Sequence, residues 1–143
     1  NRVSLVLFIP PQHVTWLLFL RGAGLYDAYE DWKRKLVEVV ETSKAGEGDG
    51  DVSIFDFNVV SAETTAAIPK GPNSFGMGNF SDALHPRPAL GREVVAMMIG
   101  NISDRVNSNF GARVTQRNIE QHLRLVRSNL TSVVIEDLAT QHF

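Results

Sequence analysis

The chain lacks cysteine and has no large surplus of charge of either sign. Without cysteine it can form no disulfide, no thiolate zinc site and no cysteine nucleophile. Its 14 basic and 16 acidic residues give a formal net charge of −2, so electrostatics give no reason to expect a nucleic acid or an acidic membrane surface as a partner. No apolar run approaches the roughly 20 residues that a bilayer-spanning helix needs.

The composition that remains is that of a globular protein. Hydrophobic residues make up 43% and charged residues 21% of the 143 positions, which is enough for one compact domain with its own core. The chain opens with Asn1 and enters an apolar run within two residues. This start favours a sequence cut out of a longer protein.

The first part of the chain has the pattern of a strand followed by a short helix. Residues 3–9 form an almost continuously apolar run that stops at Pro10 and Pro11. Such a run is typical of a strand that is buried on both faces, as parallel sheets require, and two prolines cannot continue it. Residues 14–20 are mostly apolar and predict a short helix that ends near Gly22 or Gly24.

A long amphipathic helix and a second strand come next. The predicted apolar stripe of the helix comprises Leu25, Tyr29, Trp32, Leu36, Val39 and Val40. The predicted solvent side comprises Asp27, Glu30, Asp31, Lys33, Arg34, Lys35, Glu38 and Glu41. Residues 52–57 predict the second strand. Strand, helix and strand together predict a βαβ unit whose two strands are parallel neighbours.

Residues 58–86 have no sustained period and follow a parallel strand, where ligands bind in open α/β sheets. Pro88 suits the first turn of a further helix, with Leu90, Val94, Val95 and Met98 as its buried stripe. Thr115 suits the N-cap of a last amphipathic helix. Its predicted buried face is Ile119, Leu123, Val126 and Leu130. His122, within this helix, is expected to be solvated.

Asp82 and His85 are the best candidates for chemistry. Histidine is the side chain best suited to move a proton near neutral pH, and in a serine-type triad a carboxylate must orient it. An aspartate three residues earlier can do this across one tight turn. The spacing alone is a weak signal, and an Asp/His pair in a loop is more often a cap or surface polarity. Its position, at the end of a long loop and before a helix, strengthens the candidacy.

The segment Asp82-Ala-Leu-His85 with the following residues 87–95 resembles the last conserved block of SGNH/GDSL hydrolases and acyltransferases. Residues 54–57, then Thr64-Thr65 and Pro69, are similar to uncharacterised bacterial SGNH-like proteins. The segments 9–13 and 110–115 are also similar to theirs. The resemblance covers roughly residues 3–128, and each of its motifs is short.

This resemblance implies a three-layer α/β/α fold with a parallel sheet, the flavodoxin-like SGNH fold, of which the chain is the C-terminal portion. It implies ester hydrolysis or O-acyl transfer through an acyl-serine, with His85 as general base and Asp82 as its orienting acid. The Gly-Asp-Ser-like nucleophile block and the oxyanion-hole blocks are not in this sequence. The parent protein is therefore expected to be a serine esterase or acyltransferase, and this chain alone is expected to be inactive.

The resemblance also carries expectations about partners. The substrate would be a small acylated molecule, including acylated carbohydrate, and the missing N-terminal segment of the same domain would be a partner. A periplasmic or membrane-tethered envelope protein is implied, and no cofactor is. We expect residues 1–100 to belong to the SGNH-like domain and residues 101–143 to form a helical extension.

Two alternatives remain open at this stage. His13 follows Pro10-Pro11 at the same sheet edge as Asp82 and His85, where it would line the substrate pocket or simply bond backbone. Metal binding by these three side chains is not favoured, because no two of them have the spacing of metal ligands on one helix. The missing nucleophile also allows a different class of protein, a non-catalytic α/β binding or interaction module.

Overall fold

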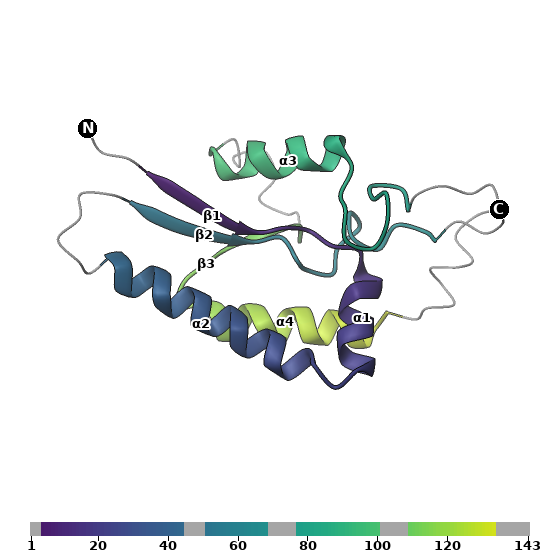
Figure 1. Cartoon of the computed structure of the whole chain (residues 1–143), viewed down its shortest axis with the longest axis horizontal. Helices are drawn as coiled ribbons and strands as arrows, with labels where there is room; N and C mark the ends of the chain where they lie inside the picture. The colour runs from purple at the N-terminus through teal and green to yellow at the C-terminus, as the bar shows by residue number, and fades with distance from the viewer. Residues whose placement is uncertain (1–3, 45–50, 69–76, 101–108, 134–143) are drawn as a thin grey trace.

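The structure is a computed structural model that describes residues 4–44, 51–68, 77–100 and 109–133. Within these ranges the chain forms three strands and four helices (Figure 1). In chain order they are β1 (Leu5–Ile9), α1 (Val14–Gly22), α2 (Tyr26–Lys44), β2 (Val52–Asp56), α3 (Pro88–Met98), β3 (Ala112–Val114) and α4 (Ile119–Thr131). The predicted α/β class is confirmed.

The three strands form one small mixed sheet in the order β1-β2-β3. Strands β1 and β2 are parallel, with Leu5 opposite Val52 and Ile9 opposite Asp56, which confirms the predicted parallel pair. Strand β3 pairs with β2 in the antiparallel direction. The expectation of a wholly parallel sheet is therefore wrong for the described strands. Three residues, Ala112–Val114, are too few to give a strand pattern in the sequence.

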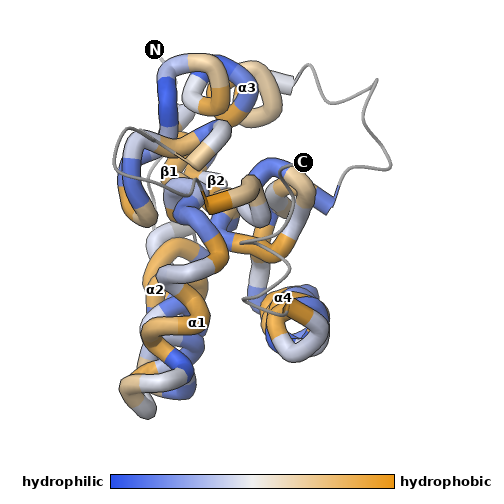
Figure 2. The backbone as a smooth tube through the Cα atoms, turned by 90° about the vertical axis from the view of Figure 1, so that its right-hand side faces the viewer, coloured by the Kyte–Doolittle hydropathy of each residue, from blue (hydrophilic) through white to orange (hydrophobic). Residues whose placement is uncertain are grey.

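Helices cover both faces of the sheet (Figure 1). Helix α3 lies on one face, and helices α1, α2 and α4 lie on the other. Seen end on, α2 lies beneath the β1 side of the sheet, whereas α4 lies towards the opposite side (Figure 2). No described helix is long and apolar enough to span a bilayer.

The apolar core unites elements from both ends of the chain. Val14 of α1, Phe57, Leu90 of α3 and Val126 of α4 belong to one buried cluster. The predicted buried face of the last helix is confirmed in full, since Ile119, Leu123, Val126 and Leu130 are all buried. The expected division after residue 100 stays a prediction, but β3 and α4 share their core with the preceding elements.

Helix α2 has the predicted period, but its buried face matches the predicted stripe only in part: Val40 is buried, and Tyr29 and Leu36 pack against the core. Tyr26, Val37 and Val40 are buried together with Glu30 and Lys33, two residues expected on the solvent side. In contrast Leu25, Trp32 and Val39 of the predicted apolar stripe are exposed. The helix therefore buries one face against the sheet. Trp32 and Val39 on the neighbouring face are exposed, and the ring of Trp32 stacks on Tyr29 of the same helix.

Strand β1 also differs from expectation, because Leu5, Val6 and Phe8 are exposed. Among the strands that the structure describes, β1 lies at the edge of the sheet and pairs with β2 alone. Its side chains therefore lack the flanking elements that would cover a central strand. Beside it, Phe8, Pro10 and Pro11 line a largely apolar pocket of about 570 Å³ together with Pro86 and residues 91, 92, 94 and 95 of α3. We call this edge, together with the exposed residues Trp32 and Val39 of α2, the open side.

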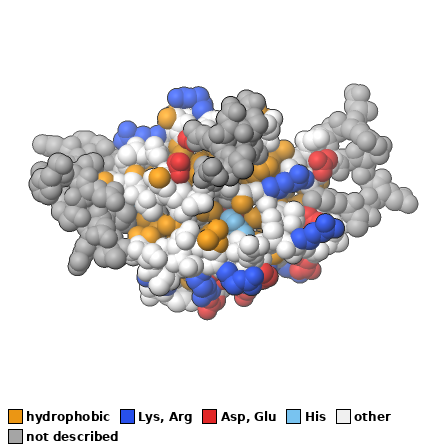
Figure 3. All heavy atoms as spheres, turned by 180° about the vertical axis from the view of Figure 1, so that it is seen from behind, with side chains coloured by type: hydrophobic (Ala, Val, Ile, Leu, Met, Phe, Trp, Pro, Cys, Tyr) orange, Lys and Arg blue, Asp and Glu red, His pale blue; other side chains and the backbone are white. Residues whose placement is uncertain are grey.

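On the opposite side, ion pairs join helices α2 and α4. Arg34 of α2 bonds Glu120 of α4 at 2.7 Å, and Arg127 of α4 bonds Glu30 at 2.8 Å and Asp27 at 2.5 Å. Figure 3 shows hydrophobic side chains over the middle of the rear face and charged ones gathered along its lower border, where Figure 1 has α2 and α4. We call the side on which α2 and α4 are joined by these ion pairs the closed side.

A glycine allows the chain to pass close to the core at the start of β3. Gly111 has a φ of +81°, in the left-handed region, and a Cβ added there would overlap the ring of Phe57. Only glycine meets both constraints without strain. The segment Phe110-Gly-Ala-Arg-Val-Thr115, noted above as part of the resemblance, thus has a packing requirement of its own.

Candidate functional site

The loop before α3 brings Asp82 and His85 into direct contact. The Nδ1 atom of His85 lies 2.7 Å and 2.9 Å from the two carboxylate oxygens of Asp82. The Asp82 Oδ1 atom also accepts the backbone N–H groups of Leu84 and His85, at 2.8 Å and 3.0 Å. The carboxylate therefore fixes both the turn and the imidazole, which is the arrangement that the spacing predicted.

These contacts affect the carboxyl group of Asp82. The backbone N–H of Leu84 and then the side chain of His85 lower the pKa of Asp82 below its usual value. The remaining ring nitrogen of His85, Nε2, has no hydrogen-bond partner among the described residues. A histidine held by its Nδ1 with its Nε2 turned outward has the orientation that a general base of an acyl-transfer enzyme needs.

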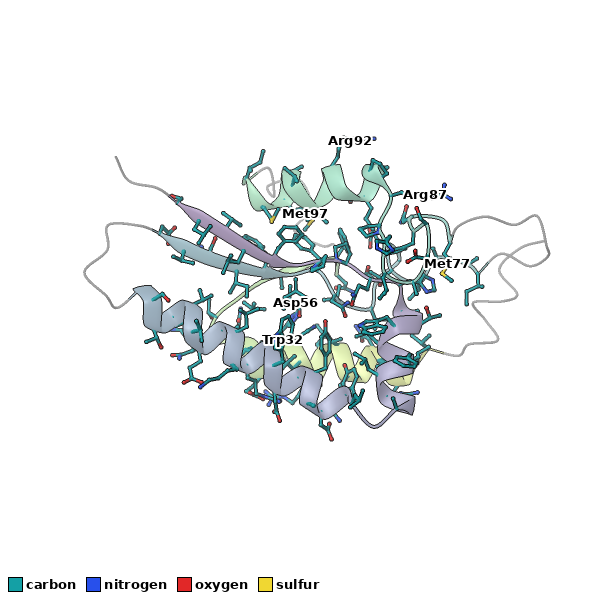
Figure 4. The ribbon with its side chains drawn as sticks, viewed as in Figure 1. Trp32, Asp56, Met77, Arg87, Arg92 and Met97 are labelled. Atoms are coloured by element: carbon teal, nitrogen blue, oxygen red, sulfur yellow. The ribbon has the colours of Figure 1, made fainter. Side chains whose placement is uncertain are left out.

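Both side chains are strongly exposed, His85 at 75% and Asp82 at 57%. The loop itself is well anchored: Phe80 is fully buried, and Ser81 N–H donates to the carbonyl of His85. Arg87 is the N-cap of α3, with Pro88 in its first turn as expected. Figure 4 shows Arg87 at the beginning of α3. The pair is thus a rigid but uncovered feature at the carboxyl end of the parallel strands.

His13 lies against this loop but has a structural role. Its backbone N–H donates to the carbonyl of Ala83 at 3.0 Å, so His13 is at the same edge as the Asp82–His85 pair, as expected. Its side chain is fully buried and caps α1 through Thr15. Its Nε2 lies 2.7 Å from the carbonyl of Ala66. Burial lowers the pKa of His13, partly opposed by that hydrogen bond. Of the two alternatives for His13, the structure supports backbone bonding.

A second aspartate–histidine pair lies inside the molecule. Asp56, at the end of β2, is fully buried between the sheet and α2 (Figure 4). Its Oδ2 atom lies 2.7 Å from the ammonium of Lys33 and 2.9 Å from Nε2 of His122. The side chains of Lys33 and His122 are only 2% and 9% exposed. The expectation that His122 is solvated is therefore wrong.

Both oxygens of the Asp56 carboxylate accept hydrogen bonds. Its Oδ1 atom accepts the backbone N–H of Asn58 at 2.9 Å, and Lys33 also donates to the Asn58 carbonyl. Burial alone would raise the pKa of Asp56, but Lys33 and His122 outweigh it and hold the pKa below its usual value. This network joins α2, β2 and α4 by charge in the interior, where an unpaired ion would be costly.

The sequence carried little signal for this cluster. Lys33 and His122 stand on amphipathic helices at positions where charge is ordinarily solvated, and 66 residues separate Asp56 from His122. Only a buried partner reveals that such a lysine points inward. The one available signal was an aspartate between two phenylalanines at the end of a buried strand. Within the described ranges, no group of three or more histidine, cysteine, aspartate or glutamate side chains has the geometry to hold a metal ion.

Comparison with known proteins adds no assignment to this geometry. No family of proteins, no curated protein and no solved structure matches the chain.

Proposed function

We propose that the chain is the C-terminal part of an SGNH-type serine esterase or O-acyltransferase and supplies the Asp82–His85 half of its catalytic triad. The observation that carries the proposal is the paired contact of His85 Nδ1 with both carboxylate oxygens of Asp82, which leaves Nε2 free. The substrate would be a small acylated molecule, including an acylated carbohydrate.

The open side supports this proposal, because it is where further polypeptide would add. The unpaired edge of β1 offers a row of backbone groups to another strand. Apolar side chains continue from Phe8 to the neighbouring surface of α3, including Val95. Pro86, next to His85, lines the same pocket. A strand added at β1 would therefore end near the exposed imidazole.

In the proposed mechanism each residue has a defined role. The hydroxyl of a serine on the added segment attacks the ester carbonyl carbon, and Nε2 of His85 accepts the hydroxyl proton. Asp82 holds Nδ1–H and stabilises the imidazolium that forms. The proton then passes to the leaving alkoxide, the acyl group stays on the serine, and water or a second alcohol removes it.

The test uses the full-length protein with its upstream sequence and p-nitrophenyl acetate as substrate. We expect the wild-type protein to turn over and His85→Ala to lose about a thousandfold or more in kcat, with Asp82→Asn also strongly impaired. Lys35→Ala, an exposed change on α2, is the control for handling and folding. Full activity of His85→Ala would overturn the proposal.

A second candidate, a non-catalytic α/β interaction module, is favoured by one observation. The Asp82–His85 pair is largely exposed, whereas catalytic pairs act in sites that exclude water. The same experiment separates the two candidates. A full-length protein with no serine-dependent turnover, whether or not it binds a partner through β1, would favour the module.

A further inference from the structure

One pocket of the structure is not used by the proposed function. His122 lines a pocket of about 210 Å³ between the segment leading into β3 and helix α4. Leu125 and Val126 of α4 line it together with Asn109 and Asn129. Most of this wall is apolar, and the polar side chains are one imidazole and two carboxamides.

We propose that this pocket binds a small molecule with an apolar body and one hydroxyl group, and that Nδ1 of His122 accepts the hydroxyl proton in a hydrogen bond. Asp56 determines which ring nitrogen is available. In the neutral imidazole, Nε2–H donates to Asp56 Oδ2 at 2.9 Å, so Nδ1 carries the lone pair. Nδ1 has no hydrogen-bond partner within the described part of the chain.

The buried charges make this orientation rigid. The single negative charge of Asp56 is already compensated by Lys33 at 2.7 Å, so the interior holds a balanced pair before His122 is considered. Asn58 donates to the other carboxylate oxygen and prevents the group from turning. His122 is thus fixed by a carboxylate that is itself fixed, which is how binding sites position a polar group in an apolar wall.

The volume limits the size of the ligand. An apolar cavity of roughly 150 Å³ holds one benzene ring, so about 210 Å³ admits one ring with a substituent or a short branched chain. The apolar body would contact Val126 and Leu125 of α4. Discrimination would come from the hydroxyl group, because a ligand without it leaves the Nδ1 lone pair desolvated and unpaired.

The test compares phenol with toluene on the 143-residue chain. Phenol has the hydroxyl donor, and toluene has nearly the same shape without it. Titrations are followed by the ring ¹⁵N resonances of the histidines and the methyl resonances of Val126 and Leu125. We expect phenol to shift His122 Nδ1 and these methyl groups in a saturable way, with toluene binding at least tenfold more weakly.

Three results would overturn the inference: equal affinity for phenol and toluene, phenol-induced shifts that avoid His122, or no saturable shift. His122→Leu should abolish the preference for phenol, whereas Arg124→Leu, on the exposed side of the same helix, should keep it. The wild-type comparison stands even if the His122 variant is unfolded. The outcome does not depend on whether Asp82 and His85 are catalytic.

Discussion

The closed and open sides of the molecule each hold an aspartate–histidine pair, and the two pairs are built in opposite ways. Asp56 and His122 come from β2 and α4 and meet in the interior with Lys33. Asp82 and His85 come from a single turn and meet in solvent. The first pair depends on the whole tertiary structure, and the second depends on three residues of local geometry. The Asp56–His122 contact therefore depends on global stability, whereas the Asp82–His85 contact depends only on the order of one turn.

The strongest way to break this comparison is to remove each carboxylate in turn. Asp56→Ala leaves the ammonium of Lys33 buried without its partner, so we expect a loss of about 3–5 kcal/mol in the free energy of unfolding. Asp82→Ala should cost far less, because its side chain is mostly exposed. Urea denaturation followed by circular dichroism measures both. The double change Lys33→Met with Asp56→Leu should recover much of the loss; equal losses for the two single variants would contradict the comparison.

A smaller effect is expected from the glycine that brings β3 against the core of the closed side. Gly111→Ala adds a methyl group that overlaps Phe57 and forces a residue with φ of +81° to carry a side chain. We expect a loss of about 2–4 kcal/mol, from left-handed strain and overpacking together. Gly100→Ala is the matched control, since its φ is +93° but nothing lies near the added Cβ. The difference between the two thermal midpoints isolates the steric part.

Acid should weaken the buried pair of the closed side. Because the pKa of Asp56 is held below its ordinary value of 3.8, this carboxylate stabilises the native state above that pH, and the contribution is lost as the pH falls through the depressed pKa. We expect the urea midpoint to fall progressively below about pH 4. The fall should be shallower for Asp56→Asn, which has no carboxyl group to protonate. Parallel pH profiles for the two proteins would show that other groups determine the acid response.

The smallest effect should appear on the open side of α2. Trp32→Gln replaces a half-exposed side chain that stacks on Tyr29 and should change the free energy of unfolding by about 1 kcal/mol or less. Val37→Ala, on the sheet-facing side of the same helix, should cost about 1.5–3 kcal/mol. Chemical denaturation of the two variants tests which face of α2 is buried. A larger loss for Trp32→Gln would place the helix in the rotation that its hydropathy suggested.

The sequence was informative where a pattern is local. The parallel β1–β2 pair, the approximate positions of the helices and the buried face of α4 follow from period and from the end signals Pro88 and Gly24. The Asp82–His85 contact also follows, because one turn determines it. None of these inferences needs knowledge of distant residues. The expected N-cap Thr115 was wrong, because α4 begins after Asn118.

The errors share a physical cause, which is dependence on remote neighbours. The hydropathy pattern of α2 predicted one apolar stripe that mixes buried and exposed residues. It gave no sign that Lys33 is buried, because its partner Asp56 lies 23 residues away in the chain. The same limit hid the role of His122 and the exposure of β1, since burial of a strand is decided by what flanks it. The short β3 was missed because three residues give no period.

The free edge of the sheet affects how the chain behaves in solution. Strand β1 is Leu-Val-Leu-Phe-Ile, with no lysine, no proline and no bulge to blunt its free edge. An exposed apolar edge strand of this kind is an aggregation hazard, and natural proteins usually protect such edges. A solution of the isolated polypeptide is therefore expected to seed fibrillar deposits from its first strand, and a lysine in place of Val6 should delay them.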